Sequence, residues 1–181
     1  MQWQDNKRFC LIYPFVLNVE GGYVSPERAK AIGDKGGATN HGVAYNYHAG
    51  RLKNYGIYSP HDMVKLNQEQ AIDFYYQYFW IPSQADEIPD YRLAFAYFDM
   101  AVNSGIEAAD AALLKLPDQR FWYYKGDDQN EWYFWPLTVY FLGTRLFAYT
   151  SYRQWTDFGK GWTNRMGKIQ QAYWKMRHYQ P

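Results

Sequence analysis

The sequence lacks the features that mark several common classes of protein. It contains one cysteine, Cys10, so neither an intrachain disulfide nor a thiolate metal cluster is possible. Nineteen Lys and Arg residues against 18 Asp and Glu residues leave a net charge of +1. No strong field of one sign therefore favours nucleic acid or an anionic membrane, and we predict no nucleic-acid partner.

Long hydrophobic runs are also missing. No stretch approaches the roughly 18 apolar residues that a membrane helix needs. The N-terminal residues show neither a sustained apolar region nor a small-residue cleavage site of the kind that signal peptides carry. We therefore expect no integral membrane segment and a protein made in the cytoplasm without a signal peptide.

Motifs for common cofactors and nucleophiles are absent from the sequence as well. The four histidines show no metal-ligand spacing. There is no phosphate-binding Gly-x-Gly-x-x-Gly or Walker loop after a strand, and no Gly-x-Ser-x-Gly elbow. We expect neither a metal nor a cofactor, which leaves a mechanism based on carboxylates.

Aromatic residues, in contrast, are abundant. Tyr contributes 19 residues, Phe 11 and Trp 8, together 21% of the chain. Tyrosine and tryptophan join an apolar face to a polar tip, so they can pack in a core, line a groove or stack on a sugar ring. We expect most of them in the core and at its rim.

Apolar residues recur at helical spacing along most of the chain, which predicts an all-α fold. Pro14 implies that the first helix is kinked or divided in two. Two aromatic runs around a polar turn between residues 118 and 136 fit either a β-hairpin or an aromatic-rich loop. Gly159 and Gly161 are expected to break the opening turns of the last helix. The predicted helices cover about residues 7–20, 43–54, 60–66, 67–80, 90–104, 106–116, 137–152 and 155–176.

The first helix ends in a carboxylate followed by two glycines, Glu20-Gly21-Gly22. Glycines stop a helix because they adopt left-handed conformations freely. In the last turn the helix dipole disfavours the charged form of Glu20, and a raised pKa suits a general acid. The alternative is a solvated glutamate at a helix end.

A second stretch, residues 23–42, follows; it has little apolar periodicity, is glycine-rich from residue 33 on, and carries Asp34 and Thr39. Irregular segments of this length in a compact domain are usually functional, and we expect a loop or small hairpin here. Glycosidases set an acid against a second polar group that activates water. We predict Glu20 as the acid, with Asp34 and Thr39 positioning the water.

Asp99 lies in a predicted helix that is apolar on nearly every side. A buried carboxylate needs hydrogen bonds or a positive partner. We therefore expect it to pair with other groups as structural support, with a contribution to the cleft as the alternative.

Five motifs occur in order along the chain: Glu20-Gly21-Gly22-Tyr23, then residues 34–42, 78–86, 98–105 and 158–165. Together they resemble glycoside hydrolase family 108, the N-acetylmuramidases of phages and prophages, sometimes labelled secretion activator proteins. Two stretches depart from the family pattern. Residues 24–33 are longer and more basic, and residues 119–140 lack its Asp-Gly-x-x-Gly-Pro turn.

This resemblance implies a lysozyme-like helical domain with a C-terminal peptidoglycan-binding region. The expected division is a catalytic lobe at residues 1–104 and a helical lobe at residues 105–181 packed on it. Glu20 aligns with the family's catalytic glutamate. The predicted substrate-binding residues lie in the shared motifs: Tyr23, Gly37, Asn40, His41 and Asn103.

The resulting prediction is an endolysin-like monomer whose partner is the peptidoglycan glycan strand. It would cleave the β-1,4 bond between N-acetylmuramic acid and N-acetylglucosamine, with inversion as in phage-type lysozymes, and would act at the cell wall or periplasm after release. The alternative is a non-catalytic peptidoglycan-binding or secretion-associated factor.

Overall fold

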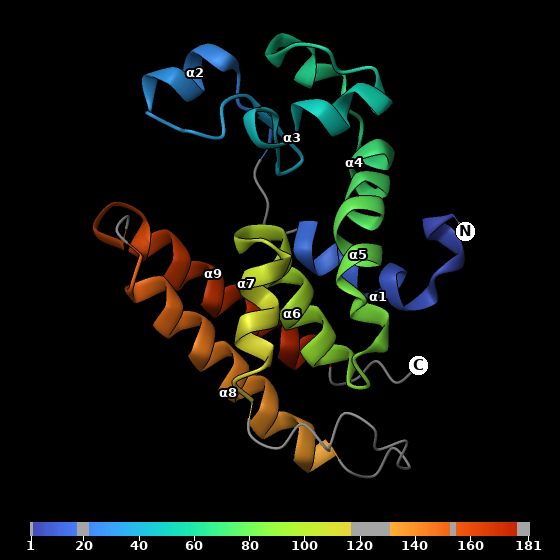
Figure 1. The fold of residues 1–181 in the computed structure, drawn as a ribbon, viewed down its shortest axis with the longest axis vertical. Coiled ribbons are helices and arrows are strands. Elements are labelled where there is room, and N and C mark those ends of the chain that lie inside the picture. The colour runs from blue at the N-terminus through green and yellow to red at the C-terminus, as the bar shows by residue number, and fades with distance from the viewer. Residues whose placement is uncertain (1, 18–21, 117–130, 153–154, 177–181) are drawn as a thin grey trace.

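The computed structural model describes residues 2–17, 22–116, 131–152 and 155–176 (Figure 1). Most of these residues are helical, and the sheet among them is a single two-stranded hairpin, so the all-α prediction is confirmed. No helix in the described ranges is long and apolar enough to cross a membrane. The main helices are α1 (Lys7–Leu17), α2 (Pro26–Ala31), α3 (Tyr45–Leu52), α4 (Gln68–Tyr75), α5 (Ile81–Ser83), α6 (Tyr91–Ser104), α7 (Ile106–Leu113), α8 (Glu131–Thr150) and α9 (Trp155–Met176).

Short elements complete the chain. Four are 3-10 turns: η1 (Trp3–Asp5), η2 (Lys53–Tyr55), η3 (Pro60–Lys65) and η5 (Ala85–Glu87). A π-helical turn, η4 (Tyr76–Trp80), joins α4 to α5. The strands are β1 (Thr39–Asn40) and β2 (Val43–Ala44).

Helix α6 is the centre of the core. Its N-cap, Asp90, accepts hydrogen bonds from the backbone N–H groups of Arg92 and Leu93, which fixes where the helix begins. Ten consecutive residues from Arg92 to Ala101 are buried, as expected for a helix with neighbours on most sides. Those neighbours are α1, α7, α8 and α9.

Helix α1 packs on α6 through its apolar face, with Phe9, Ile12 and Val16 almost fully buried. It is one helix that contains Pro14, so of the two alternatives above the undivided helix is correct over Lys7–Leu17. The ring of Phe9 lies 5.9 Å from that of Phe98 and 5.4 Å from that of Trp80. These edge contacts tie α1, α6 and η4 into one core.

Elements α4, η4 and α5 follow one another without a break and connect the two ends of the molecule. Figure 1 shows α2 and α3 at the top, α6 to α9 below, and α4 running between the two groups. At the upper end the ring of Phe74 packs against His48 and Tyr55. At the lower end Trp80 packs against Phe98, with ring centroids 5.0 Å apart. The upper group of elements is therefore attached to the helical bundle through buried aromatic rings.

The core crosses the predicted lobe boundary between residues 104 and 105. One cluster of buried residues contains Phe98 from one side and Tyr149, Met166 and Ile169 from the other. The described parts of the two predicted lobes therefore share a core. The division itself stays a prediction.

Several predicted boundaries are wrong. Residues 43–44 form a strand before α3, so the helix expected from Val43 begins at Tyr45. Helix α8 begins at Glu131, so neither a hairpin nor a loop covers residues 131–136; residues 117–130 lie outside the described ranges. Helix α9 passes through Gly159 and Gly161 without a break. A helical glycine costs only about 1 kcal/mol, which burial of Met166 and Ile169 in the shared core can offset.

Candidate active site

The predicted acid, Glu20, lies outside the described residues, as do Asn18, Val19 and Gly21. The described part of the candidate site is the wall that follows it. This wall consists of residues 22–24, the loop at 32–38, the β1–β2 hairpin and the start of α3.

A backbone bridge holds the chain after Gly22 against the strand that carries Thr39. The N–H of Val24 donates to the carbonyl of Thr39 at 2.8 Å, and the N–H of Thr39 donates back at 3.0 Å. On its other edge Thr39 pairs with Ala44 of β2. Tyr23, whose side chain is 42% exposed, therefore lies one residue from this bridge.

Asp34 is exposed at the end of the α2 segment, where backbone and side-chain bonds hold it in place. Its N–H donates to the carbonyl of Ala29 at 2.9 Å. Its Oδ1 accepts from the N–H of Gly36 at 2.8 Å, a side-chain turn typical of aspartate. Oδ2 makes no hydrogen bond within the described ranges, so it can accept a hydrogen bond from a bound water.

Thr39 is half-buried, and its hydroxyl donates to the carbonyl of Gly37 at 3.1 Å. A hydroxyl that donates one hydrogen bond keeps lone pairs that can accept another. The oxygen of Thr39 can therefore accept a hydrogen bond from a water or a sugar hydroxyl.

Gly36 and Gly37 let this loop pack closely against the start of α3. A Cβ on Gly37 would lie 2.6 Å from Nδ2 of Asn46, and the residue has φ of +72°, which favours glycine. Nδ2 of Asn46 in turn donates to the carbonyl of Lys35 at 3.0 Å. Gly37 was predicted to bind substrate. Its observed contacts are with Asn46, inside the protein.

Two other predicted substrate-binding residues, Asn40 and His41, lie in the hairpin. The buried amide of Asn40 donates to the carbonyls of Met63 and Leu66 at 2.9 and 3.1 Å, which fastens the hairpin to η3. His41 and Gly42 have φ of 48° and 79° and form the two-residue turn between the strands, as type I′ hairpins require. The carbonyl of His41 accepts from the hydroxyl of Tyr75. The observed contacts of the Asn40 side chain are thus inside the protein.

Asn103 and Asp99 lie elsewhere, on α6. The amide of Asn103 donates to the carbonyl of Asp99 one turn earlier at 2.7 Å. Asp99 is fully buried and faces two arginines: Nη1 of Arg145 lies 2.6 Å from its Oδ2, and Nη2 of Arg165 lies 2.7 Å from its Oδ1. Burial by itself would raise the pKa of Asp99, but the two guanidinium groups outweigh it and hold that pKa below its ordinary value. The expected charge partner is therefore present twice, on α8 and α9.

The structure thus connects Tyr23, Asp34, Gly37 and Thr39 in one wall and places Asn103 and Asp99 on the central helix. Two residues of α3 were not recognised as candidates from the sequence. Tyr47 is 66% exposed beside Gly36. His48 packs its ring against Phe74 and Phe79, and this burial lowers its pKa to about 4, with Arg51 contributing. Helical periodicity alone could not predict that Tyr47 is exposed while His48 packs inward, because the exposure of Tyr47 depends on how the loop crosses α3.

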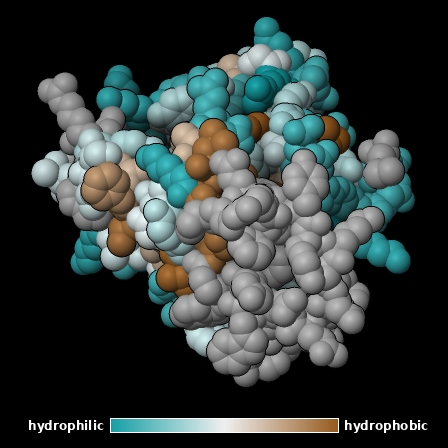
Figure 2. Space-filling model, turned by 60° about the horizontal axis from the view of Figure 1, so that its bottom comes forward, coloured by the Kyte–Doolittle hydropathy of each residue, from teal (hydrophilic) through white to brown (hydrophobic). Residues whose placement is uncertain are grey.

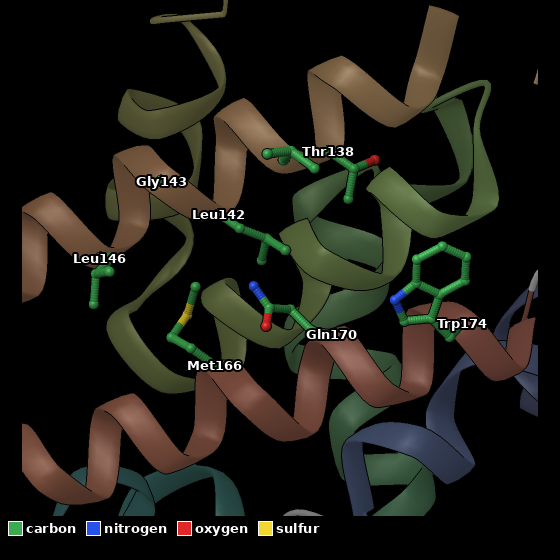
Figure 3. Close-up of a pocket in the computed structure, with 8 residues that line it drawn as sticks. Thr138, Leu142, Gly143, Leu146, Met166, Gln170 and Trp174 are labelled. Carbon is green, nitrogen blue, oxygen red and sulfur yellow. The ribbon is translucent and has the colours of Figure 1, made fainter. Parts of the chain in front are cut away.

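A separate groove of about 440 Å³ lies between α8 and α9 (Figure 3). Figure 2 shows hydrophobic residues near the middle of one face of the molecule, next to hydrophilic surface. Among the described residues, no three His, Cys, Asp or Glu side chains are grouped as metal ligands. The groove is lined by Thr138, Val139, Leu142, Gly143, Leu146, Met166, Gln170 and Trp174.

Comparisons with known proteins agree with this architecture. The solved structure described as that of Brucella abortus SagA superposes with a TM-score of 0.70 and 24% sequence identity, over 94% of this chain and 96% of that one. At this identity the likeness shows a shared fold alone. No protein of curated function matches the chain. Residues 13–105, just over half of the sequence, match the family described as Glycosyl hydrolase 108, and they include Glu20, Asp34 and Thr39; the chain therefore belongs to this family of glycosidic-bond hydrolases.

Proposed function

We propose that the protein is an N-acetylmuramidase that cleaves the β-1,4 bond between N-acetylmuramic acid and N-acetylglucosamine in peptidoglycan. The observation that carries this proposal is the bridge between Val24 and Thr39. It holds Val24, four residues beyond Glu20, against the strand of Thr39, which follows the loop of Asp34. Family membership supports the glycosidic chemistry.

In the proposed reaction, the carboxyl group of Glu20 gives its proton to the leaving glycosidic oxygen as the bond to the anomeric carbon breaks. A water attacks that carbon from the opposite face and loses a proton to Asp34, while Thr39 accepts a hydrogen bond from the same water. The product then has inverted configuration. An inverting pair of carboxyl groups lies about 6.5–9.5 Å apart, against about 5–5.5 Å for a retaining pair.

Asp34 is suited to this role because backbone bonds fix it and only Oδ1 is engaged in the described part of the chain. Among the predicted substrate contacts, we retain Tyr23 and the exposed Asn103 for the glycan. We reassign Asn40, Gly37 and the backbone of His41 to holding the hairpin and its loop, since their described contacts are internal.

The first testable prediction concerns Glu20. Glu20→Gln keeps the size of the side chain but has no acidic proton, so clearing of purified cell walls should slow by at least about 10²-fold. Turbidity measures the rate, and mass spectrometry of the released muropeptides identifies the bond that is cut. Glu69→Gln, an exposed glutamate in the first turn of α4, is the matched control and should clear at the wild-type rate.

Equal clearing by wild type and Glu20→Gln would overturn the role of Glu20 as acid. Muropeptides with N-acetylglucosamine at the new reducing end would instead identify a glucosaminidase. A product of retained anomeric configuration would contradict the water-positioning role of Asp34 and Thr39.

The second candidate function is a non-catalytic peptidoglycan-binding or secretion-associated factor. The groove between α8 and α9 favours it, because Trp174 at 52% exposure and Gln170 offer an aromatic face and an amide for sugars. If binding is the function, Trp174→Ala weakens retention on cell walls while wild type and Glu20→Gln both fail to clear them. The proposed place of action is the cell wall in either case, with the protein acting as a monomer.

A further inference from the structure

Tyr47 lies next to Asp34 and exposes most of its ring. The Cβ that Gly36 lacks would stand 3.4 Å from Cε2 of Tyr47 and 3.2 Å from Oδ1 of Asp34. Because both atoms lie that close to one point, the ring and the carboxylate are neighbours across Gly36. The side chain of Tyr47 is nevertheless 66% exposed.

The backbone that carries Tyr47 is fixed to the same loop that carries Asp34. The N–H of Tyr45 donates to the carbonyl of Ala38 at 2.9 Å, and the N–H of Asn46 donates to the carbonyl of Gly36 at 3.1 Å. The amide of Asn46 adds its bond to Lys35. The ring and the carboxylate are therefore held in a common frame.

Packing does not account for Tyr47. A ring that keeps two-thirds of its surface in water gains little from burial, whereas the neighbouring His48 is the residue of this pair that packs into Phe74 and Phe79. An exposed aromatic face held on a helix is suited to binding a flat apolar surface, such as the C–H face of a pyranose ring.

The same side of α3 continues with groups that bind polar ligands. Arg51 follows Tyr47 by one helical turn, so the two share a face, and its guanidinium lies 5.0 Å from the ring centre of Tyr78. The amide of Asn54 donates to the hydroxyl of Tyr78 at 2.8 Å. An aromatic ring followed by a fixed cation and amide fits a glycan with hydroxyl and carboxylate substituents.

We propose that Tyr47 stacks on a sugar ring of the glycan strand at the subsite adjacent to Asp34, and that the strand continues along α3 toward Arg51. The proposal rests on the proposed function for the identity of the glycan. It adds a substrate-positioning residue that lies outside the motifs from which the site was predicted.

Binding is measured in the Glu20→Gln background, so that turnover does not interfere. The probe is soluble peptidoglycan strands freed of stem peptides with an amidase, titrated by calorimetry. Tyr47→Leu, which keeps an apolar cover over Gly36 but removes the aromatic face, should weaken binding about tenfold, the scale of one aromatic stacking contact. Tyr47→Phe, which keeps that face, should bind as the parent does.

Tyr58→Leu is the matched control, because Tyr58 is 68% exposed. Its carbonyl accepts from the hydroxyl of Tyr45 and its N–H donates to Asp62, and the substitution keeps both of these backbone groups. Equal weakening by Tyr58→Leu and Tyr47→Leu would overturn the proposal, as would parent-like binding by Tyr47→Leu. Absence of binding by the parent would also overturn it. Thermal unfolding of each variant shows whether the fold is kept; if Tyr47→Leu unfolds, Tyr47→Phe against Tyr47→Gln gives the same comparison.

Measurements of turnover distinguish a failure of this proposal from a failure of the proposed function. With Glu20 intact, Tyr47→Leu should raise KM on the same strands about tenfold with little change in kcat, as expected when binding common to ground and transition state is lost. If Glu20→Gln clears walls at the wild-type rate but Tyr47→Leu still weakens binding, the assignment of the acid fails and the subsite stands. A fall in kcat alone would contradict the stacking role.

Discussion

At the scale of single residues, Asp99 is a carboxylate that the core depends on. It has no exposed surface and lies between Arg145 of α8 and Arg165 of α9, so one side chain of α6 links three helices. The sequence predicted a paired carboxylate from its position among apolar residues. It could not identify the partners, which are 46 and 66 residues away in the chain.

Asp99→Asn should therefore destabilise the protein by about 3–5 kcal/mol, because Arg145 is left as a buried charge with no anion beside it. Urea unfolding at pH 7 measures the loss. The exposed pair of Glu27 and His61 supplies the control: Glu27→Gln should leave the unfolding midpoint nearly unchanged. A midpoint for Asp99→Asn close to that of wild type would contradict the buried pairing.

His48 gives a pH dependence with a definite sign. Its pKa is lowered from 6.5 to about 4 in the folded protein, so the unfolded chain binds more protons between these values. Its contribution to stability is thus complete above pH 6.5 and is lost as pH falls from 6.5 toward 4. His48→Phe, which keeps an aromatic ring against Phe74 and Phe79, should reduce the drop in urea midpoint between pH 7 and pH 4.5. An identical drop in wild type and variant would rule out this origin.

At the scale of elements, the wall of the candidate site depends on glycines whose roles the sequence only partly revealed. The clustering of glycines predicted a loop or hairpin, and the two-residue turn at His41 and Gly42 agrees with that. The close approach of Gly37 to Asn46 was not predictable, because it depends on where α3 begins. Because residues 43–44 form a strand, α3 begins two residues later than the apolar periodicity predicts.

A pair of glycine substitutions separates backbone strain from crowding. Gly33 and Gly37 have φ of +70° and +72°, but a Cβ would meet nothing within 4 Å at Gly33 and would meet Asn46 at 2.6 Å at Gly37. Gly33→Ala should lose about 1–2 kcal/mol from strain. Gly37→Ala should lose more and should also slow wall clearing, because the loop that holds Asp34 must shift.

Combining Gly37→Ala with Asn46→Ala tests this explanation. Removal of the Asn46 side chain relieves the crowding, so the double variant should lose less stability than the sum of the two single variants in urea unfolding. If the two losses of stability simply add, crowding against Asn46 is not the reason that Gly37→Ala destabilises the protein.

At the scale of the whole molecule, the helical class was predictable because apolar periodicity extends along most of the chain. Four of the five motifs, which include every predicted site residue, lie within the family match at residues 13–105. The predicted roles of Glu20, Asp34 and Thr39 remain proposals. Sequence patterns could not predict that the two lobes share one core, because that depends on contacts between aromatic residues far apart in the chain.

The shared core leads to a prediction about fragments. A protein of residues 1–104 should not fold on its own, because Tyr97 and Asp99 would lose their partners on α7, α8 and α9. Circular dichroism with thermal unfolding should show a non-cooperative transition for the fragment and a cooperative one for the full chain. A cooperative, wall-clearing fragment would establish residues 1–104 as an independent domain.

The bridge between Val24 and Thr39 has a further consequence for sequence variation. It closes residues 25–38 into a loop whose two ends are fixed to each other, so residues can be added or removed within the loop without changing how its base is joined. Residues 24–33, where the sequence departs from the family pattern, fall almost entirely inside it. A change in the length or charge of this segment can therefore leave the pairing of Val24 with Thr39 in place.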